Sequence, residues 1–316
     1  MKYLLVCLIL LLSLQGFSQI DYFTLTRESG TLMGMVEHRA PANPNGKKDP
    51  VILWLHGVDG NRSAPTSTVD TTRIDEVTNK GPLRLVRGPN ASNHYTSGGS
   101  PLPLFQKPGT VGASERYRWN IVAPQNPFSG TNQWACDVVG SAMDYIRANP
   151  SKWDTSCIIL VGYSLGGHGI KKCGTNSDVL PYVKYIVDIA GGSDNTVIGG
   201  TSMTRAEAFA ASGVQMDFYI TIDDEHVTST YYRYTDSLVN RIKRSNPKVV
   251  PTYIKMKDVT QTHPTSFPEH DYMEVMVARD TIAGNQIEDC TNGDVWTDFE
   301  TIFHRGLRFK GIRRLP

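Results

Sequence analysis

The chain has 316 residues, of which 40% are hydrophobic and 20% are charged. This length and composition are typical of a globular protein with a large core, not of a disordered chain. The 32 Lys and Arg residues nearly balance the 31 Asp and Glu residues. A neutral chain has no electrostatic basis for binding nucleic acid or an anionic membrane, so we exclude both classes of partner.

Residues 1–18 have the features of a secretory signal peptide. Lys2 precedes an apolar run from Tyr3 to Leu14, and Gly16-Phe-Ser18 forms a small-x-small cleavage site before Gln19. The run is shorter than the roughly 20 residues that span a bilayer. We therefore expect a secreted or periplasmic protein that leaves the membrane once the signal is removed.

Four cysteines remain in the mature chain: Cys136, Cys157, Cys173 and Cys290. An even number in an exported protein permits disulfides, and their pairing stays open. Their spacing matches no metal site, so we expect neither a metal nor another cofactor.

Short apolar runs alternate with helical patterns along the chain, which predicts an α/β protein with a mostly parallel sheet and helices on both faces. An edge hairpin is expected in GTLMGMVEHRAP, which begins at Gly30, and a helix on the apolar periodicity from Trp134 to Ile146. The predicted core strands are Val51–Leu55, Asn120–Ala123, Cys157–Val161, Tyr185–Ile189, Phe218–Ile222 and Val249–Met256.

Two regions depart from this alternation within a single domain of residues 19–316. Residues 58–118 are rich in Gly, Pro, Ser, Thr and Asn and are too long for a plain connection. We expect an insertion over the carboxyl edge of the sheet, where ligands bind in such folds. Residues 278–316 form a C-terminal helical or basic tail, in which the last five charged residues are all Lys or Arg.

The segment CIILVGYSLGGHG, Cys157 to Gly169, is the most informative part of the chain. Its apolar run predicts a buried strand, and the glycines that follow predict a turn too tight for side chains. A strand-turn-helix elbow of this kind exposes the Ser164 hydroxyl above the sheet, with Gly162 and Gly166 allowing strand and helix to approach closely. Ser164 is the candidate nucleophile. The alternative is a glycine-rich turn that binds phosphate at a helix N-terminus.

A second motif, His56-Gly57-Val58-Asp59-Gly60, ends the first core strand. Acyl transfer places negative charge on a carbonyl oxygen, and each backbone N–H directed at it contributes about 3 kcal/mol. We expect the N–H groups of Leu165 and Val58 to form this oxyanion hole. His56 is expected to be a structural hydrogen-bonding residue of the turn.

These motifs resemble the α/β-hydrolase superfamily, through VILWLHG, NIVAPQNP and IILVGYSLGG. The chain is most similar to the exported bacterial esterases that include polyhydroxybutyrate depolymerase-like and feruloyl-esterase-like proteins, often described as predicted peptidases. GTLMGMVEHRAP and KGPLRLV extend the resemblance over most of residues 30–230. The family implies a triad in the chain order Ser, Asp, His.

The family places the acid after the strand that contains Phe218, in an Asp-x-x-Val pattern that Asp224 and Val227 satisfy. The glycine that usually precedes this Asp is absent, so Asp223 remains a competitor. His270 resembles the family's His-Asp-x-Trp motif and opens an apolar-periodic stretch that would anchor it. His263, before Pro264, is the alternative base.

The function expected from these residues is a secreted serine hydrolase that cleaves carboxylic esters through an acyl-enzyme. Its substrate would be an ester-containing small molecule or polymer, with polyester, feruloyl and acetyl esters as candidates. Two alternatives remain: a serine peptidase of the same fold, and a non-catalytic binding protein on a hydrolase scaffold. Fold does not select among them, because function depends on the site.

Overall fold

The computed structural model describes residues 19–40, 46, 48–58, 77, 82–83, 120–127, 134–192, 201–221 and 229–256. Within these ranges eight strands form one sheet in the order β1-β2-β4-β3-β5-β6-β7-β8. The strands are β1 (Gln19–Thr26), β2 (Leu32–Arg39), β3 (Pro50–Leu55), β4 (Asn120–Pro124), β5 (Asp154–Tyr163), β6 (Val183–Ile189), β7 (Gln215–Thr221) and β8 (Thr252–Met256).

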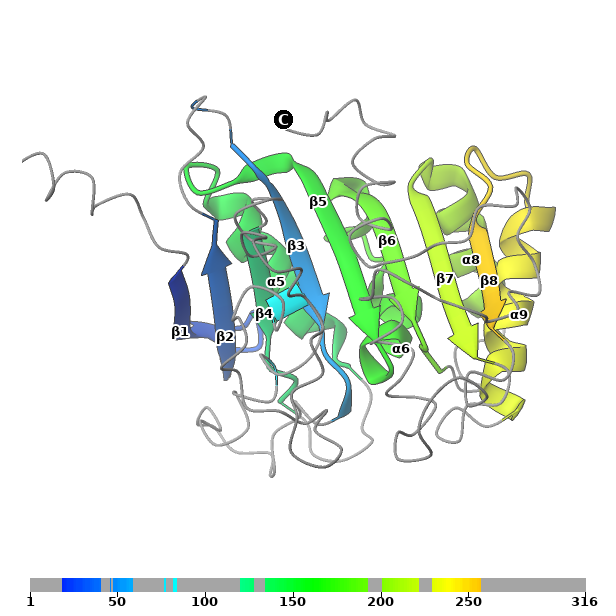
Figure 1. Ribbon diagram of the computed structural model, residues 1–316, viewed down its shortest axis with the longest axis horizontal. Coiled ribbons are helices and arrows are strands. Elements are labelled where there is room, and N and C mark those ends of the chain that lie inside the picture. The colour runs from blue at the N-terminus through cyan, green and yellow to red at the C-terminus, as the bar shows by residue number, and fades with distance from the viewer. Residues whose placement is uncertain are drawn as a thin grey trace, which may run out of the picture.

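The sheet is mostly parallel, as the alternating pattern predicted. Strands β4, β3, β5, β6, β7 and β8 pair in parallel, whereas β1, β2 and β4 pair antiparallel at one edge. The arrowheads of β3, β5, β6, β7 and β8 therefore point to the same edge of the sheet (Figure 1). The residues that follow these strands gather at that carboxyl edge.

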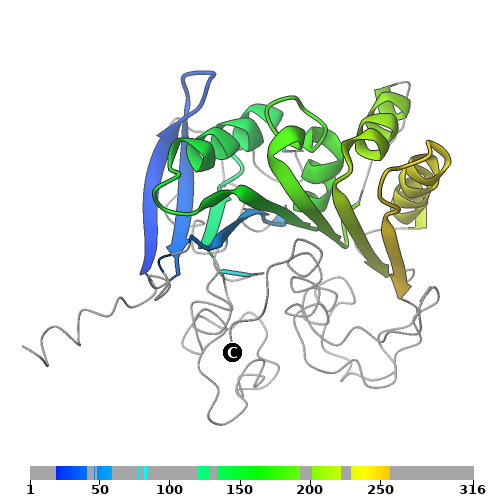
Figure 2. The same cartoon turned by 90° about the horizontal axis from the view of Figure 1, so that it is seen from above.

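The helices whose bounds are described lie on one face of the sheet (Figure 2), and helices on the other face, which the alternating pattern also predicted, stay a prediction. The described helices are α5 (Cys136–Ala148), α6 (Leu165–Cys173), the 3-10 helix η2 (Leu180–Tyr182), α8 (Thr201–Ser212) and α9 (Ser229–Arg244). The predicted insertion of residues 58–118 and the C-terminal tail of residues 278–316 lie almost entirely outside the described residues, as do residues 1–18. Among the helices that are described, none is long and apolar enough to cross a membrane.

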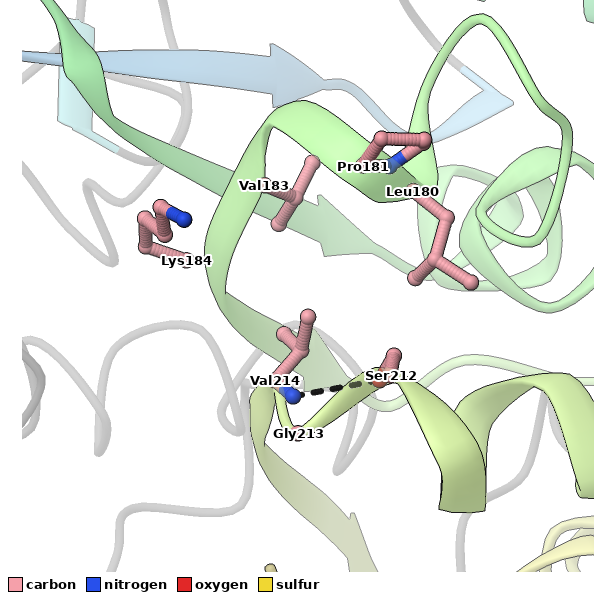
Figure 3. Close-up of a pocket in the computed structure, with 7 residues that line it drawn as sticks. All are labelled: Leu180, Pro181, Val183, Lys184, Ser212, Gly213 and Val214. Atoms are coloured by element: carbon pink, nitrogen blue, oxygen red, sulfur yellow. Dashed lines mark hydrogen bonds between the residues drawn. The ribbon is translucent and has the colours of Figure 1, made fainter. Parts of the chain in front are cut away.

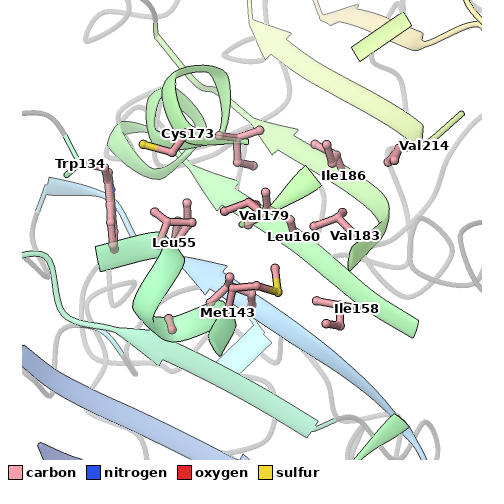
Figure 4. Packing of buried hydrophobic residues seen from close by; sticks show 14 of the residues in the cluster. Leu55, Trp134, Met143, Ile158, Leu160, Cys173, Val179, Val183, Ile186 and Val214 are labelled. Carbon is pink, nitrogen blue, oxygen red and sulfur yellow. The ribbon is translucent and has the colours of Figure 1, made fainter. Parts of the chain in front are cut away.

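The central strands are buried along most of their length, which explains their apolar sequences. In β3, β5 and β6 nearly every residue after the first few is buried. Figure 4 shows Leu55, Leu160 and Ile186 from these strands in the same core as Met143 of α5. Burying an apolar side chain of this size contributes about 1.5–3 kcal/mol, so the core positions the strands that carry the site.

The edge hairpin is confirmed, but its bounds differ from the prediction. Its first strand is β1, which pairs with β2 from Gln19↔Arg39 to Thr26↔Leu32, and the turn between them contains Gly30. The side chains of β1 alternate between half-buried and exposed. An edge strand with one solvated face lacks the continuous apolar run that marks the central strands.

Several other boundaries also differ from the predicted ones; β5, for example, runs from Asp154 to Tyr163 and is longer than the predicted Cys157–Val161. The apolar pattern placed Trp134 within a helix, but α5 begins at Cys136 and Trp134 is fully buried just before it. Strand β8 begins at Thr252 instead of Val249. Pro251 has no N–H to join a sheet, and Val250 before it is 64% exposed.

Candidate active site

Ser164 lies between the end of β5 at Tyr163 and the start of α6 at Leu165. Its backbone has φ 54° and ψ −115°, a combination that is uncommon for any residue except glycine. The Ser164 N–H donates to the carbonyl of Ile189 at the end of β6, with N and O 2.9 Å apart. The predicted strand-turn-helix elbow is thus present at Ser164, at the carboxyl edge of the sheet.

Two glycines make the elbow sterically feasible. A Cβ on Gly166 would lie 1.8 Å from the carbonyl oxygen of Leu55, and a Cβ on Gly162 would lie 2.4 Å from the carbonyl oxygen of Gly166. Both contacts involve backbone atoms, which cannot rotate away as a side chain does. Only glycine lets α6 approach β3 and β5 this closely, as the G-x-S-x-G motif predicted.

The turn after β3 lies against the same serine. A Cβ on Gly57 would be 3.4 Å from the Cβ of Ser164, so His56, Gly57 and Val58 border the nucleophile. On the other side, Leu165 is the first residue of α6, and an α-helix leaves its first N–H groups without intrahelical acceptors. Leu165 is therefore next to Ser164 in the chain, and the turn that contains Val58 lies beside Ser164 in space, while their role as an oxyanion hole stays a prediction.

His56 is a structural residue of this turn, as expected. Its side chain is buried, and its Nε2 accepts a hydrogen bond from the backbone N–H of Asn126 at 3.0 Å. The ring proton is therefore on Nδ1, which donates to the carbonyl of Gly57 at 2.6 Å. Both nitrogens are thus used to hold the turn, and neither is available as a base for Ser164.

Trp134 supports the turn from the α5 side. Its ring centroid is 4.9 Å from that of His56, and a Cβ on Gly169 of α6 would lie 2.8 Å from the indole.

A disulfide between Cys136 and Cys173, with Cα atoms 5.1 Å apart, joins the start of α5 to the end of α6. Cys157 is buried and has no disulfide within the described residues.

The candidate acid and base lie outside the described residues. Strand β7 ends at Thr221, and Asp223 and Asp224 follow it in the sequence. His263 and His270 follow β8 in the same way. The assignment of these four residues stays a prediction.

Sequence reasoning missed a buried ion pair behind the elbow. Lys171 of α6 and Asp188 of β6 are 0% and 1% exposed, with Nζ and Oδ2 2.7 Å apart. Burial raises the pKa of Asp188 and lowers that of Lys171, and the attraction between the two groups opposes both shifts. The sequence has two consecutive lysines near the end of this helix, and nothing in that pattern indicates that the first of them is buried.

A small cavity lies at the opposite end of the sheet from Ser164. Its volume is about 240 Å³, and Figure 3 shows its lining, which comes from η2, the amino-terminal end of β6 and the residues just before β7. The lining residues are Leu180, Pro181, Val183, Lys184, Ser212, Gly213 and Val214. Because Ser164 is at the carboxyl edge, this cavity is not part of the serine site. The described ranges contain no group of three or more His, Cys, Asp or Glu residues that would hold a metal ion.

No protein-family model matches the sequence, and no curated protein matches it. Solved structures match the fold. A puromycin-hydrolyzing peptidase of Mycobacterium tuberculosis has a TM-score of 0.50 and 10% identity, over 82% of this chain and 38% of that chain. A thermostable esterase has a TM-score of 0.49 and 14% identity, over 81% and 59% of the two chains.

An IroE-like serine hydrolase from Shewanella oneidensis has a TM-score of 0.46 and 13% identity, over 81% of this chain and 78% of that chain. The chain spans 38% of the peptidase and 59% of the esterase, less than two thirds of either. At these identities the likeness concerns the fold. With its mostly parallel sheet and the serine elbow between β5 and α6, the protein has the α/β-hydrolase fold.

Proposed function

We propose that this protein is an exported serine hydrolase that cleaves carboxylic esters through an acyl-enzyme on Ser164. The observation that supports this most strongly is the backbone of Ser164, at φ 54° and ψ −115° between a buried strand and a helix. Strain of this kind costs of order 1–3 kcal/mol and is retained where the surrounding structure requires it, most often at functional sites. Ser164 is half-buried in this conformation, which is compatible with access of a substrate to its hydroxyl.

The backbone around Ser164 supports an oxyanion hole made by Leu165 and Val58. The Leu165 N–H lies at the positive end of the α6 dipole, which favours negative charge. Val58 is exposed at the turn that His56 holds against the elbow. Two donors on rigid backbone would stabilise the tetrahedral intermediate without reorganising during the reaction.

The strand order is compatible with the proposed triad partners. Asp224 comes soon after β7, two strands from β5, and parallel strands end at the same edge of the sheet. Strand β8 lies about 14 Å from β5 at a spacing of about 4.8 Å per strand. The chain from Met256 to His263 can extend about 23 Å, so His263 and His270 are both within reach. We keep His270 as the base and Asp224 as the acid.

The proposed reaction has two steps. The Ser164 hydroxyl attacks the ester carbonyl while His270 accepts its proton, and the alcohol leaves with that proton as the acyl-enzyme forms. Water then attacks the acyl-enzyme with His270 again as base, which releases the acid and restores Ser164. Asp224 would orient the imidazole throughout.

The first experiment is labelling of the mature protein with a fluorophosphonate probe, followed by peptide mapping. We expect a single adduct at Ser164. Ser164→Ala should remove labelling and lower esterase turnover on the order of 10⁴-fold, with an unchanged melting temperature because the serine hydroxyl adds no core packing. Labelling of another residue, or none, would refute the proposal and favour the binding-protein alternative.

The choice of base is tested with two matched variants. His270→Ala should abolish turnover, whereas His263→Ala should change KM more than kcat. Wild-type activity should fall as the pH drops through about 6–7, because the base must be neutral. The reverse pattern would make His263 the base in place of His270 and would leave the proposed Ser-Asp-His triad otherwise unchanged.

The substrate class is tested by comparing p-nitrophenyl esters of increasing chain length with feruloyl, acetyl and polyester substrates and with peptide amides. We expect ester cleavage to exceed amide cleavage by orders of magnitude in kcat/KM. Faster cleavage of peptide amides would instead establish a serine peptidase.

A further inference from the structure

The buried pair Lys171–Asp188 connects the nucleophile helix to the turn that follows β6. Lys171 lies two helical turns after Ser164 on α6, and Asp188 is near the end of β6. Both side chains are almost completely excluded from solvent. Replacing a buried ion pair by apolar residues often leaves stability equal or higher, so stability alone is a weak explanation for this pair.

The lysine ammonium is used for directed hydrogen bonds as well as for charge pairing. Its Nζ donates to the carbonyl of Gly191 and, at 3.4 Å, to that of Gly192. The carbonyl of Gly191 also accepts from the Thr235 hydroxyl of α9 at 3.2 Å. One carbonyl of the turn is thus held by two donors from two helices.

The same turn holds the backbone of Ser164. The carbonyl of Ile189 accepts the Ser164 N–H at 2.9 Å, and the next residue, Ala190, has φ 49° and donates its N–H to Tyr219 of β7 at 2.8 Å. Gly191 packs directly on α6, because a Cβ there would lie 2.8 Å from the Cα of Gly167. The carbonyl that accepts the Ser164 N–H is thus only two residues before the Gly191 carbonyl, which accepts from Lys171.

Asp188 lies between the nucleophile helix and the turn. A Cβ on either Gly167 or Gly191 would lie 2.0 Å from Asp188 Oδ1, so the carboxylate fills the space between the nucleophile helix and the turn. Its other oxygen holds the Lys171 ammonium. The pair thus contacts both backbone segments that define the elbow.

We propose that Lys171 and Asp188 are positioning residues for Ser164: by holding the 189–192 turn against α6, they keep the Ile189 carbonyl on the Ser164 N–H and so maintain the strained backbone that presents the hydroxyl. This inference rests on the proposed serine hydrolase function. Neither residue touches substrate. They would affect the rate of Ser164 acylation through the position of the serine, because misplacing a reacting group by about 1 Å can lower a rate 10²-fold.

The test compares Lys171→Met, Asp188→Asn and the double variant, with Lys184→Met as a matched control at the opposite end of β6. Each single variant leaves one charged partner buried alone, and should lower the melting temperature by roughly 10 °C. The double variant leaves no buried charge and should regain most of that loss. Its kcat and its rate of inactivation by a fluorophosphonate should stay about 10–100-fold low with KM within about twofold of wild type.

Rescue of both stability and kcat in the double variant would overturn the proposal and leave the pair a structural feature. If the double variant does not fold, Thr235→Val decides, because it removes one of the two donors to Gly191 and preserves side-chain shape. A lower kcat with unchanged KM supports the proposal, and an unchanged kcat overturns it. A wild-type protein that the probe does not label at Ser164 refutes the proposed function itself, before any variant is compared.

Discussion

Ser164 and Ala190 have positive φ at the carboxyl ends of the neighbouring strands β5 and β6. A left-handed backbone costs a non-glycine residue about 1–2 kcal/mol, so each conformation must be held by its surroundings. Ser164 and Ala190 donate their N–H groups to Ile189 and Tyr219, which lie on the next strands of the sheet. The strain at the candidate nucleophile is therefore supported by a row of backbone hydrogen bonds across β5, β6 and β7.

Gly166→Ala should disable the site by steric conflict. The new Cβ would lie 1.8 Å from the carbonyl oxygen of Leu55 and 2.9 Å from that of His56, so α6 must move away from β3. We expect a loss of at least about 3 kcal/mol in unfolding free energy, measured by urea denaturation, together with loss of probe labelling at Ser164. Gly30→Asn is the control, because Gly30 has φ 79° with nothing within 4 Å of its Cβ position. A stable, labelled Gly166→Ala protein would contradict the close approach.

His38 should make the protein less stable in acid. It is fully buried on β2, neither ring nitrogen has a hydrogen-bond partner among the described residues, and burial lowers its pKa from 6.5 to about 4. Because the unfolded chain binds the proton more readily, stability is lost as the pH falls from 6.5 to about 4, by about 3 kcal/mol. Urea titrations of wild type and His38→Leu across this range should differ by that amount. Parallel curves would show that His38 does not contribute.

At the scale of elements, the site depends on how α5 and α6 are joined. The Cys136–Cys173 disulfide connects the start of one helix to the end of the other, and Lys172 of α6 donates to the carbonyl of Trp134 at 3.0 Å. Trp134 in turn packs against His56, which holds the turn beside Ser164. The disulfide is thus connected to the candidate oxyanion hole through two aromatic rings.

Removing the disulfide should lower stability by about 4 kcal/mol, the loop-entropy value for cysteines 37 residues apart. We expect this loss in urea denaturation of the Cys136→Ala/Cys173→Ala variant. Cys157→Ala is the control, since it changes a buried cysteine outside the bridge. Peptide mapping without reduction should recover Cys136 linked to Cys173. A different linkage would exclude this pairing.

At the scale of the whole molecule, the proposed removal of the signal peptide is compatible with the position of the first strand. β1 begins at Gln19, the residue that follows the expected cleavage site, and all of its pairs with β2 lie in residues 19–39. Removing residues 1–18 would therefore leave every described residue of β1 and β2 in place. The described edge of the sheet, residues 19–39, would be retained in the proposed mature protein.

The chain expressed with its own leader in a Gram-negative host should accumulate in the periplasm or medium with Gln19 as its first residue. Mass spectrometry of the purified protein measures the terminus directly. The version that starts at Gln19 and is made in the cytoplasm should refold to the same melting temperature once its disulfide is formed. Retention of residues 1–18 in a cytoplasmic fraction would contradict the proposed export.

The sequence alone determined the features that depend on neighbouring residues. Each central strand is buried on both faces, so each appears as an apolar run that can be recognised without its partners. The elbow at Ser164 was predictable because its glycines lie within a few positions of the serine. The structural role of His56 was predictable for the same reason, since one of its hydrogen-bond partners is the adjacent Gly57.

Only the tertiary structure decided the features whose partners are distant in the chain. Strand β1 alternates like a solvated segment until its pairing with β2 is known, and the cysteines allowed several pairings until α5 and α6 were placed side by side. Lys171 and Asp188 have no local pattern that marks them as partners. They meet because α6 packs on β6. Since water is excluded there, the charge of each side chain is stabilised mainly by the charge of the other.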